Sequence, residues 1–146
     1  MVKNVKFFWI ILSVVVAVGI FLSSSMPGDE SGSASLAIAV WLQNRIPLTD
    51  YTLNFIVRKT AHFAVYFALG FCVFNSLKFY VTSKGYLLSV AWGITAVYGV
   101  IDEIHQYFVP GRVCSVLDMV INASGAVVGV FFAYCAIKFF AGESKA

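Results

Sequence analysis

The sequence predicts an all-α, polytopic membrane protein: a four-helix transmembrane bundle with a short interfacial helix between the first and second spans. Apolar residues make up 60% of the chain and charged residues only 12%, about half of the roughly 25% found in soluble domains. The mean hydropathy of +0.88 points the same way. Because a span takes about 20 residues, the 146 residues accommodate four spans in one domain.

The apolar runs place the four spans at about residues 7–23, 58–78, 86–102 and 114–140. The first run could instead be a signal peptide, because a basic start precedes it and the small residues Ser23–Ser25 follow it. It is longer than the usual signal core of about 7–15 residues, and no clear A-x-A cleavage site follows. We therefore favour a retained span.

The segment between the first two spans is predicted in two parts. Ser23–Ser35 has the composition of a loop. Ala34–Arg45 is too short to span and mixes apolar with polar side chains, which favours a short helix lying at the membrane interface. An ordered loop with one helical turn is the alternative. Pro47 then interrupts the chain, and Thr49 or Asp50 can cap the next helix.

The placement of lysine and arginine predicts the orientation in a bacterial cytoplasmic membrane. Cytoplasmic segments next to spans carry an excess of these residues. With both termini cytoplasmic, six basic residues flank membrane ends on the inside and four lie outside, so we favour this topology. The inside set is Lys3, Lys6, Lys78, Lys84, Lys138 and Lys145, and the outside set is Arg45, Arg58, Lys59 and Arg112.

Polar residues recur at helical spacing near the predicted outer ends of three spans. Residues three and four apart share one helix face, and polar groups facing hydrocarbon without a partner are costly. The three polar faces are therefore expected to meet in a pocket in the outer half of the bundle. They comprise Arg58, His62 and Tyr66; Tyr98, Asp102, His105 and Gln106; and Asp118, Asn122 and Gly125, continued by Gly129.

The stretch Ile101–Arg112, IDEIHQYFVPGR, supplies most of one expected pocket wall. Its strongest candidates for function are Asp102, His105, Gln106 and Arg112. Glu103 is expected to face sideways on the helix, where water would solvate it.

Taken together, these motifs resemble the VanZ-like family of bacterial membrane proteins over nearly the whole chain. The resemblance implies one VanZ-like transmembrane domain over residues 1–146, in a family named after a member linked to low-level teicoplanin resistance. The matching elements are RK-x-x-HF-x-x-Y at Arg58–Tyr66, DE-x-HQ at Asp102–Gln106, PGR at Pro110–Arg112, Asp118 and Asn122 of the D…N-x-x-G element, and the FLSS start at Phe21–Ser24.

The three basic candidate residues could bind an anion. Arg58 and Arg112 could hold a phosphate or carboxylate by a bidentate fork, and Lys59 could do so as a point charge. Alternatively, all three pair with the acids and only stabilise the bundle.

His62 and His105, the only two histidines, leave three interpretations open. Either could act as a general base oriented by Asp102 or Asp118, both could ligate a metal with a carboxylate, or they could form a hydrogen-bonded structural pair. The chain has no HExxH spacing, and Glu103 and His105 point to different helix faces. No metal site is predicted.

The favoured function is binding of an anionic or lipid-linked envelope component at the outer leaflet, with a link to glycopeptide resistance. The expected partners are membrane lipids and a lipid-linked cell-wall precursor or a lipoglycopeptide. A membrane-embedded hydrolase or transferase acting on a phosphate-containing envelope lipid, through His62, His105 and Asp102, is the alternative. A small transporter ranks third, because the chain has no internal repeat. No cofactor is predicted, and no basic cluster indicates nucleic-acid binding.

Overall fold

The structure is a computed structural model that describes residues 2–43 and 45–143, without the side chains of residues 2, 3, 34 and 141–143. The described residues form five helices and no strand, which confirms the predicted all-α class. The helices are α1 (Val2–Ser24), α2 (Gly28–Gln43), α3 (Asp50–Leu77), α4 (Lys84–Tyr107) and α5 (Val116–Glu143).

Within these ranges, α1, α3, α4 and α5 are long and apolar enough to cross a membrane, and α2 is a shorter helix between the first two spans. The chain is therefore a multi-pass membrane protein with the predicted four-helix bundle. The helices extend beyond the apolar runs of the sequence. α3 begins at Asp50 with Thr49 as its cap, as predicted, ahead of the apolar span from about residue 58, and α4 continues past residue 102 to Tyr107.

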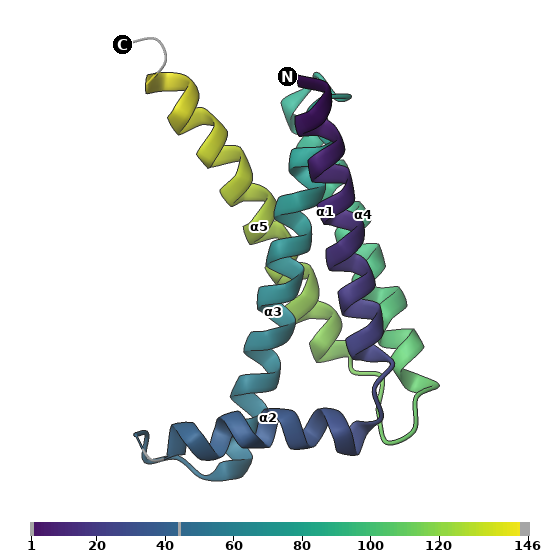
Figure 1. The fold of residues 1–146 in the computed structure, drawn as a ribbon, viewed down its shortest axis with the longest axis vertical. Helices are drawn as coiled ribbons and strands as arrows, with labels where there is room; N and C mark the ends of the chain where they lie inside the picture. Colours follow the sequence, from purple (N-terminus) through teal and green to yellow (C-terminus); the bar gives the residue numbers. More distant parts are fainter. Residues whose placement is uncertain (1, 44, 144–146) are drawn as a thin grey trace.

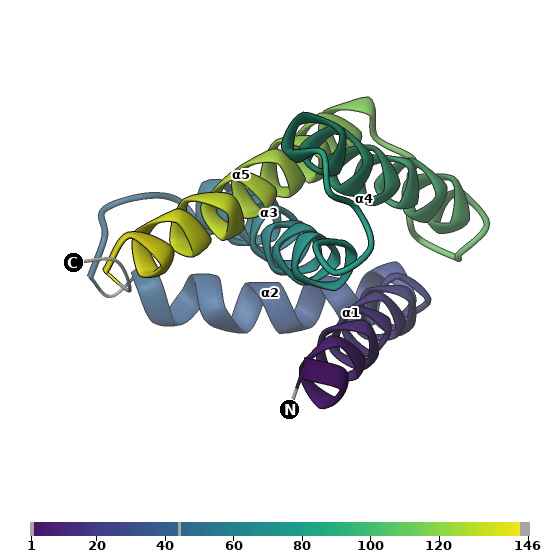
Figure 2. The same ribbon diagram turned by 90° about the horizontal axis from the view of Figure 1, so that it is seen from above.

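Helix α3 is the centre of the bundle and contacts each of the other four helices. Figure 1 shows α2 lying across one end of the long helices, nearly perpendicular to them, while the start of α1 and the end of α5 lie at the opposite end. Figure 2 shows α3 between α5 and α1, with α4 beside α5. The outward faces of α1, including Phe8, Ile11 and Val15, are exposed in the structure, as expected for a lipid-facing helix.

The two ends of the bundle differ in chemistry. An apolar core fills the end near the termini, where Phe74 of α3 packs with Leu87 and Ala91 of α4 and with Val130 and Ala133 of α5. Most of the buried polar residues, including Asp102 and Gln106, lie toward the side of α2, whereas Asn75 and Ser76 lie near the end of α3 at the other end of the bundle. The larger polar group and the apolar core thus lie toward opposite ends of the bundle.

The prediction of a loop over Ser23–Ser35 is wrong in its second half, because α2 already begins at Gly28. The acidic Asp29 and Glu30 lie in its first turn, where negative charge favours the helix dipole. The Gly28 N–H donates to the Pro110 carbonyl at 3.0 Å. A Cβ at Gly28 would lie 2.0 Å from the Gly111 carbonyl oxygen. This backbone contact fixes α2 against the loop that follows α4.

Candidate binding pocket

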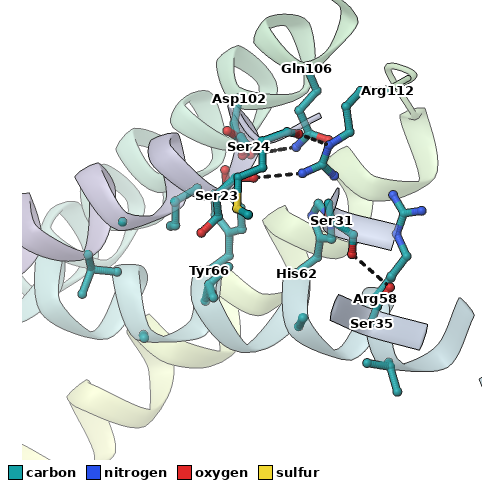
Figure 3. Close-up of a pocket in the computed structure, with 18 of the residues that line it drawn as sticks. Ser23, Ser24, Ser31, Ser35, Arg58, His62, Tyr66, Asp102, Gln106 and Arg112 are labelled. Atoms are coloured by element: carbon teal, nitrogen blue, oxygen red, sulfur yellow. Dashed lines mark hydrogen bonds between the residues drawn. The ribbon is translucent and has the colours of Figure 1, made fainter. Parts of the chain in front are cut away.

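A pocket of about 660 Å³ lies between α1, α2, α3 and α4. Figure 3 shows residues of all four helices, together with Arg112 of the α4–α5 loop, converging on it. Its polar lining consists of Ser23, Ser24, Ser31, Ser35, Arg58, His62, Tyr66, Asp102, Gln106 and Arg112.

The α3 wall follows the predicted stripe, since Arg58, His62 and Tyr66 all line the pocket. Arg58 is half-buried and makes no hydrogen bond or ion pair with any described residue. Tyr66 has an exposed fraction of 0%, and its hydroxyl has no hydrogen-bond partner in the described part of the chain. This wall therefore offers a free cation to the pocket, and the Tyr66 hydroxyl lies next to the Asp102 carboxylate.

The opposite wall comes from the end of α4 and the loop after it. Gln106 Nε2 donates to Asp102 Oδ2 at 3.3 Å and to Ser24 Oγ at 3.4 Å. Asp102 Oδ1 is buried and has no partner among the described residues. Tyr98, the first residue of the predicted α4 stripe, donates instead to the Ala17 carbonyl at 2.7 Å and does not line this pocket.

Arg112 already donates two hydrogen bonds to backbone carbonyls at the end of α1. Its Nη2 donates to the Ser23 carbonyl at 2.9 Å and its Nε to the Met26 carbonyl at 3.2 Å. Burial and the nearby positive charge of Arg58 both lower the pKa of Arg112. Two guanidinium groups close enough to repel each other create a positive potential that an anion would relieve.

The third pocket wall is not the predicted one. Asp118 and Asn122 of α5 do not line the pocket. Serines of α1 and α2 complete its polar lining instead. The FLSS motif contained two of these serines, Ser23 and Ser24. Ser31 and Ser35 lay in the segment predicted as a loop, so no helical face could be assigned to them.

Lys59, Asp118 and Asn122 instead form a second polar cluster with His62, behind the pocket. Lys59 Nζ lies 2.5 Å from Asp118 Oδ1, and His62 Nδ1 lies 3.1 Å from Asn122 Oδ1. Asn122 has an exposed fraction of 0%. His62 therefore joins the pocket to this cluster.

Glu103 belongs to the same cluster, and the expectation that water solvates it is wrong. Its exposed fraction is 0%. Its Oε2 accepts the Ser115 N–H at 3.1 Å, and its Oε1 lies 3.8 Å from His62 Nδ1. Successive helix residues point about 100° apart, and α4 packs against both α3 and α5. Adjacent residues of α4 can therefore both be buried, each against a different part of the bundle.

His105 lies apart from His62. Its ring stacks on Phe21 with centroids 4.7 Å apart, and its Nε2 lies 3.1 Å from Ser25 Oγ. His105 does not line the pocket and makes no hydrogen bond to His62 in the described part of the chain. These contacts join α4 to the end of α1.

The pocket thus contains polar groups that could contact a ligand. It presents a free guanidinium at Arg58, unused N–H groups at Arg112, and the unpartnered oxygens of Tyr66 and Asp102. A phosphate or carboxylate would accept hydrogen bonds from the first two, and a hydroxyl on the same ligand would donate to Asp102.

The sequence was compared with known proteins. The sequence model of the VanZ/LLP1 family matches residues 8–138, which is most of the chain. No curated protein and no solved structure matches it significantly.

Proposed function

Since the chain belongs to the VanZ/LLP1 family, we propose that it is an envelope membrane protein whose pocket binds an anionic lipid or lipid-linked component. The observation that carries the proposal is Arg58, a half-buried arginine that faces the pocket beside Arg112 without a carboxylate partner in the described residues. A charged group removed from water normally acquires a partner. An anionic headgroup would supply it.

Both arginines retain donors for such a headgroup. A guanidinium has five N–H donors, and Arg112 uses two of its own on the Ser23 and Met26 carbonyls. All five of Arg58 remain unused by described residues. Arginine matches phosphate by two parallel hydrogen bonds, so the pair favours a phosphate group over a neutral sugar or amide.

The rest of the pocket favours a lipid over a soluble anion. Its remaining lining is apolar and includes Val16, Gly19 and Ile20 of α1 and Val65 and Ala68 of α3. Along α1, the stretch from Val16 to Ser24 corresponds to about 12 Å at 1.5 Å per residue. A headgroup at the arginines would therefore leave room for the first part of a hydrocarbon chain between α1 and α3.

Charge placement supports an outward-facing pocket with both termini cytoplasmic. Lys6 lies at the start of α1, with its Nζ 5.5 Å from the centre of the Tyr80 ring just after α3. Lys78 and Lys84 belong to the same end of the bundle, opposite α2 and the pocket. Basic residues next to spans favour the cytoplasm, and this supports a pocket that faces the outer leaflet of the bacterial cytoplasmic membrane.

Lipid binding can be tested on the purified protein by native mass spectrometry. Polyprenyl phosphate and phosphatidylglycerol are the anionic probes, with zwitterionic phosphatidylcholine as the control lipid. Arg58→Gln is expected to weaken anionic-lipid binding about 10- to 100-fold, because a hydrogen bond to a charged group contributes about 1.5–3 kcal/mol and 1.4 kcal/mol is tenfold.

The matched control is Arg45→Gln, since Arg45 is exposed, stacks on Trp41 and lies outside the pocket. Equal binding by the Arg58 and Arg45 variants would refute the proposal.

A link to glycopeptide resistance is a further part of the proposal. Cells carrying the wild-type chain should tolerate more teicoplanin than cells carrying Arg58→Gln at equal expression.

A membrane-embedded hydrolase or transferase is the second candidate, because His62 and Asp102 line the same pocket as Arg58. In hydrolysis of a polyprenyl diphosphate, a water oxygen would bond to phosphorus, the bridging P–O bond would break, and His62 would accept the water proton. His62→Gln should then retain lipid binding but abolish phosphate release. Absence of phosphate release by the wild-type protein would leave the binding function alone.

A further inference from the structure

Behind the pocket, three helices bring one imidazole and two carboxylates together. His62 comes from α3, Glu103 from α4 and Asp118 from the first turn of α5. One ligand atom of each lies within 4.8 Å of the others. We propose that these three residues bind a divalent transition-metal ion, of the Zn²⁺ or Mn²⁺ class. The site shares His62 with the anion pocket, but Glu103 and Asp118 do not line that pocket, so the proposal does not depend on which lipid the pocket binds.

The donor set fits such an ion. Imidazole nitrogen suits zinc and its neighbours, and carboxylate oxygen suits manganese and zinc. Asn122 Oδ1 lies 3.1 Å from His62 Nδ1, which is about the separation of neighbouring ligands around an ion bound at about 2.1 Å. Asn122 therefore offers a fourth donor from the deepest side of the cluster.

The distances require only small movements. Two ligands bound at about 2.1 Å can be at most about 4.2 Å apart. His62 Nδ1 and Glu103 Oε1 already meet this limit at 3.8 Å. The widest separation among the three ligand atoms, up to 4.8 Å, exceeds the limit by less than about 1 Å, which side-chain rotation can close.

Glu103 supplies the electrostatic reason for a cation. Its exposed fraction is 0%. A backbone N–H and a long amide hydrogen bond from Gln106 at 3.5 Å are its hydrogen bonds in the described residues. A buried carboxylate with so little compensation is costly. A divalent ion shared with Asp118 would offset the charge of both acids.

Ser115 holds both acids in place. Its backbone N–H donates to Glu103 Oε2 at 3.1 Å, and its hydroxyl accepts the Asp118 N–H at 3.3 Å. The first bond holds the Glu103 carboxylate, and the second fixes the backbone of Asp118 in the first turn of α5. Outer contacts of this kind orient the ligands of metal sites.

Lys59 is the competing cation, because its Nζ lies 2.5 Å from Asp118 Oδ1. It does not satisfy the cluster by itself, since one positive charge faces the two carboxylates of Glu103 and Asp118. Its Nζ also lies 5.1 Å from the centre of the Phe55 ring, and its side chain is partly exposed. A metal ion would displace the ammonium toward the headgroup region, as long lysine side chains allow.

The test is a Mn²⁺ titration of chelator-treated protein in nanodiscs, followed by electron paramagnetic resonance of free Mn²⁺ and repeated with Zn²⁺ as a competitor. The wild-type protein should show one saturable site. Glu103→Gln should weaken it at least about 100-fold, because loss of an outer partner alone costs 10- to 100-fold. Lys59→Met should lower the Kd, since it removes the competing charge.

Two matched controls separate the site from general charge effects. Glu30→Gln makes the same chemical change at an exposed acid on α2, and His105→Gln removes the other histidine; neither should change Mn²⁺ binding. If Glu103→Gln does not fold, the electron spin-echo modulation of wild-type Mn²⁺ should still show an imidazole nitrogen, which His62→Gln abolishes and His105→Gln retains. No saturable site below about 1 mM, or a site without nitrogen, would overturn the proposal.

Discussion

Arg58 and Arg112 line the same pocket but differ in what their N–H groups already contact. Arg112 binds two backbone carbonyls at the end of α1, whereas Arg58 has no partner in the described residues. The same residue type therefore has two different roles in one pocket. Arg112 joins the α4–α5 loop to α1, and Arg58 is available for a ligand.

This difference predicts that substitution by glutamine has different effects at the two positions. Arg112→Gln should lower the free energy of unfolding by about 1–2 kcal/mol, since it removes two charge-assisted hydrogen bonds that are partly exposed. Arg58→Gln should leave stability nearly unchanged while weakening lipid binding. Denaturant titration in mild detergent measures the first effect. Equal destabilisation by both variants would contradict the assignment.

A candidate residue could be predicted from the sequence where its place on one helix face is enough to determine its surroundings. Arg58, His62 and Tyr66 share the face that lines the pocket because their spacing fixes their direction on α3. Glu103 could not be placed this way, because its surroundings depend on which two helices flank α4. His105 lies three residues from Asp102 yet stacks on Phe21, a contact that depends on where α1 ends.

At the scale of elements, the crossing of α3 and α5 is built on backbone contact. A Cβ at Gly129 would lie 2.1 Å from the Phe67 carbonyl oxygen, and one at Gly125 would lie 2.4 Å from that of Phe63. The spacing Gly125-x-x-x-Gly129 thus serves close helix packing, as the small-residue pattern suggests. The same contact sets the position of Asp118 and Asn122 next to His62.

Gly129→Ala should force the two helices apart and lower the free energy of unfolding by at least about 2 kcal/mol, because overpacking against backbone cannot be relieved by a rotamer change. Gly93→Ala is the matched control: a Cβ at Gly93 meets nothing within 4 Å, and alanine favours the helix by up to about 1 kcal/mol. Unfolding of both variants in detergent provides the comparison. Similar stabilities would show that α3 and α5 do not pack this closely.

The number and order of the long helices could be read from hydropathy, whereas the start of α2 could not. Its first residues, Gly28–Ser35, have the composition of a loop. They are helical because tertiary contacts outweigh propensity: Gly28 packs on Gly111 and donates its N–H to the Pro110 carbonyl at 3.0 Å. Gly111 has a positive φ of 74°, which glycine tolerates, so the turn after α4 helps to position α2.

At the scale of the whole molecule, the apolar core and the polar pocket lie at opposite ends of one bundle. The pocket opens beside α2, at the end away from the start of α1 and the end of α5. Which leaflet supplies the ligand therefore depends on the orientation of the bundle. Lysine and arginine placement predicts that the pocket end faces outward.

The native thiols allow this orientation to be measured directly. Cys114 is exposed in the α4–α5 loop at the pocket end, Cys72 is buried in the bundle, and Cys135, which is exposed on α5, is replaced by serine for the measurement. A membrane-impermeant maleimide should label Cys114 in intact cells, and Cys114→Ser should remove the signal. In that background, Ser83→Cys places a thiol at the exposed N-cap of α4, at the other end of the bundle, and should react only after permeabilisation. The reverse pattern would place Arg58 at the inner leaflet, and cytoplasmic lipids, rather than outer envelope components, would then be the ligands to test.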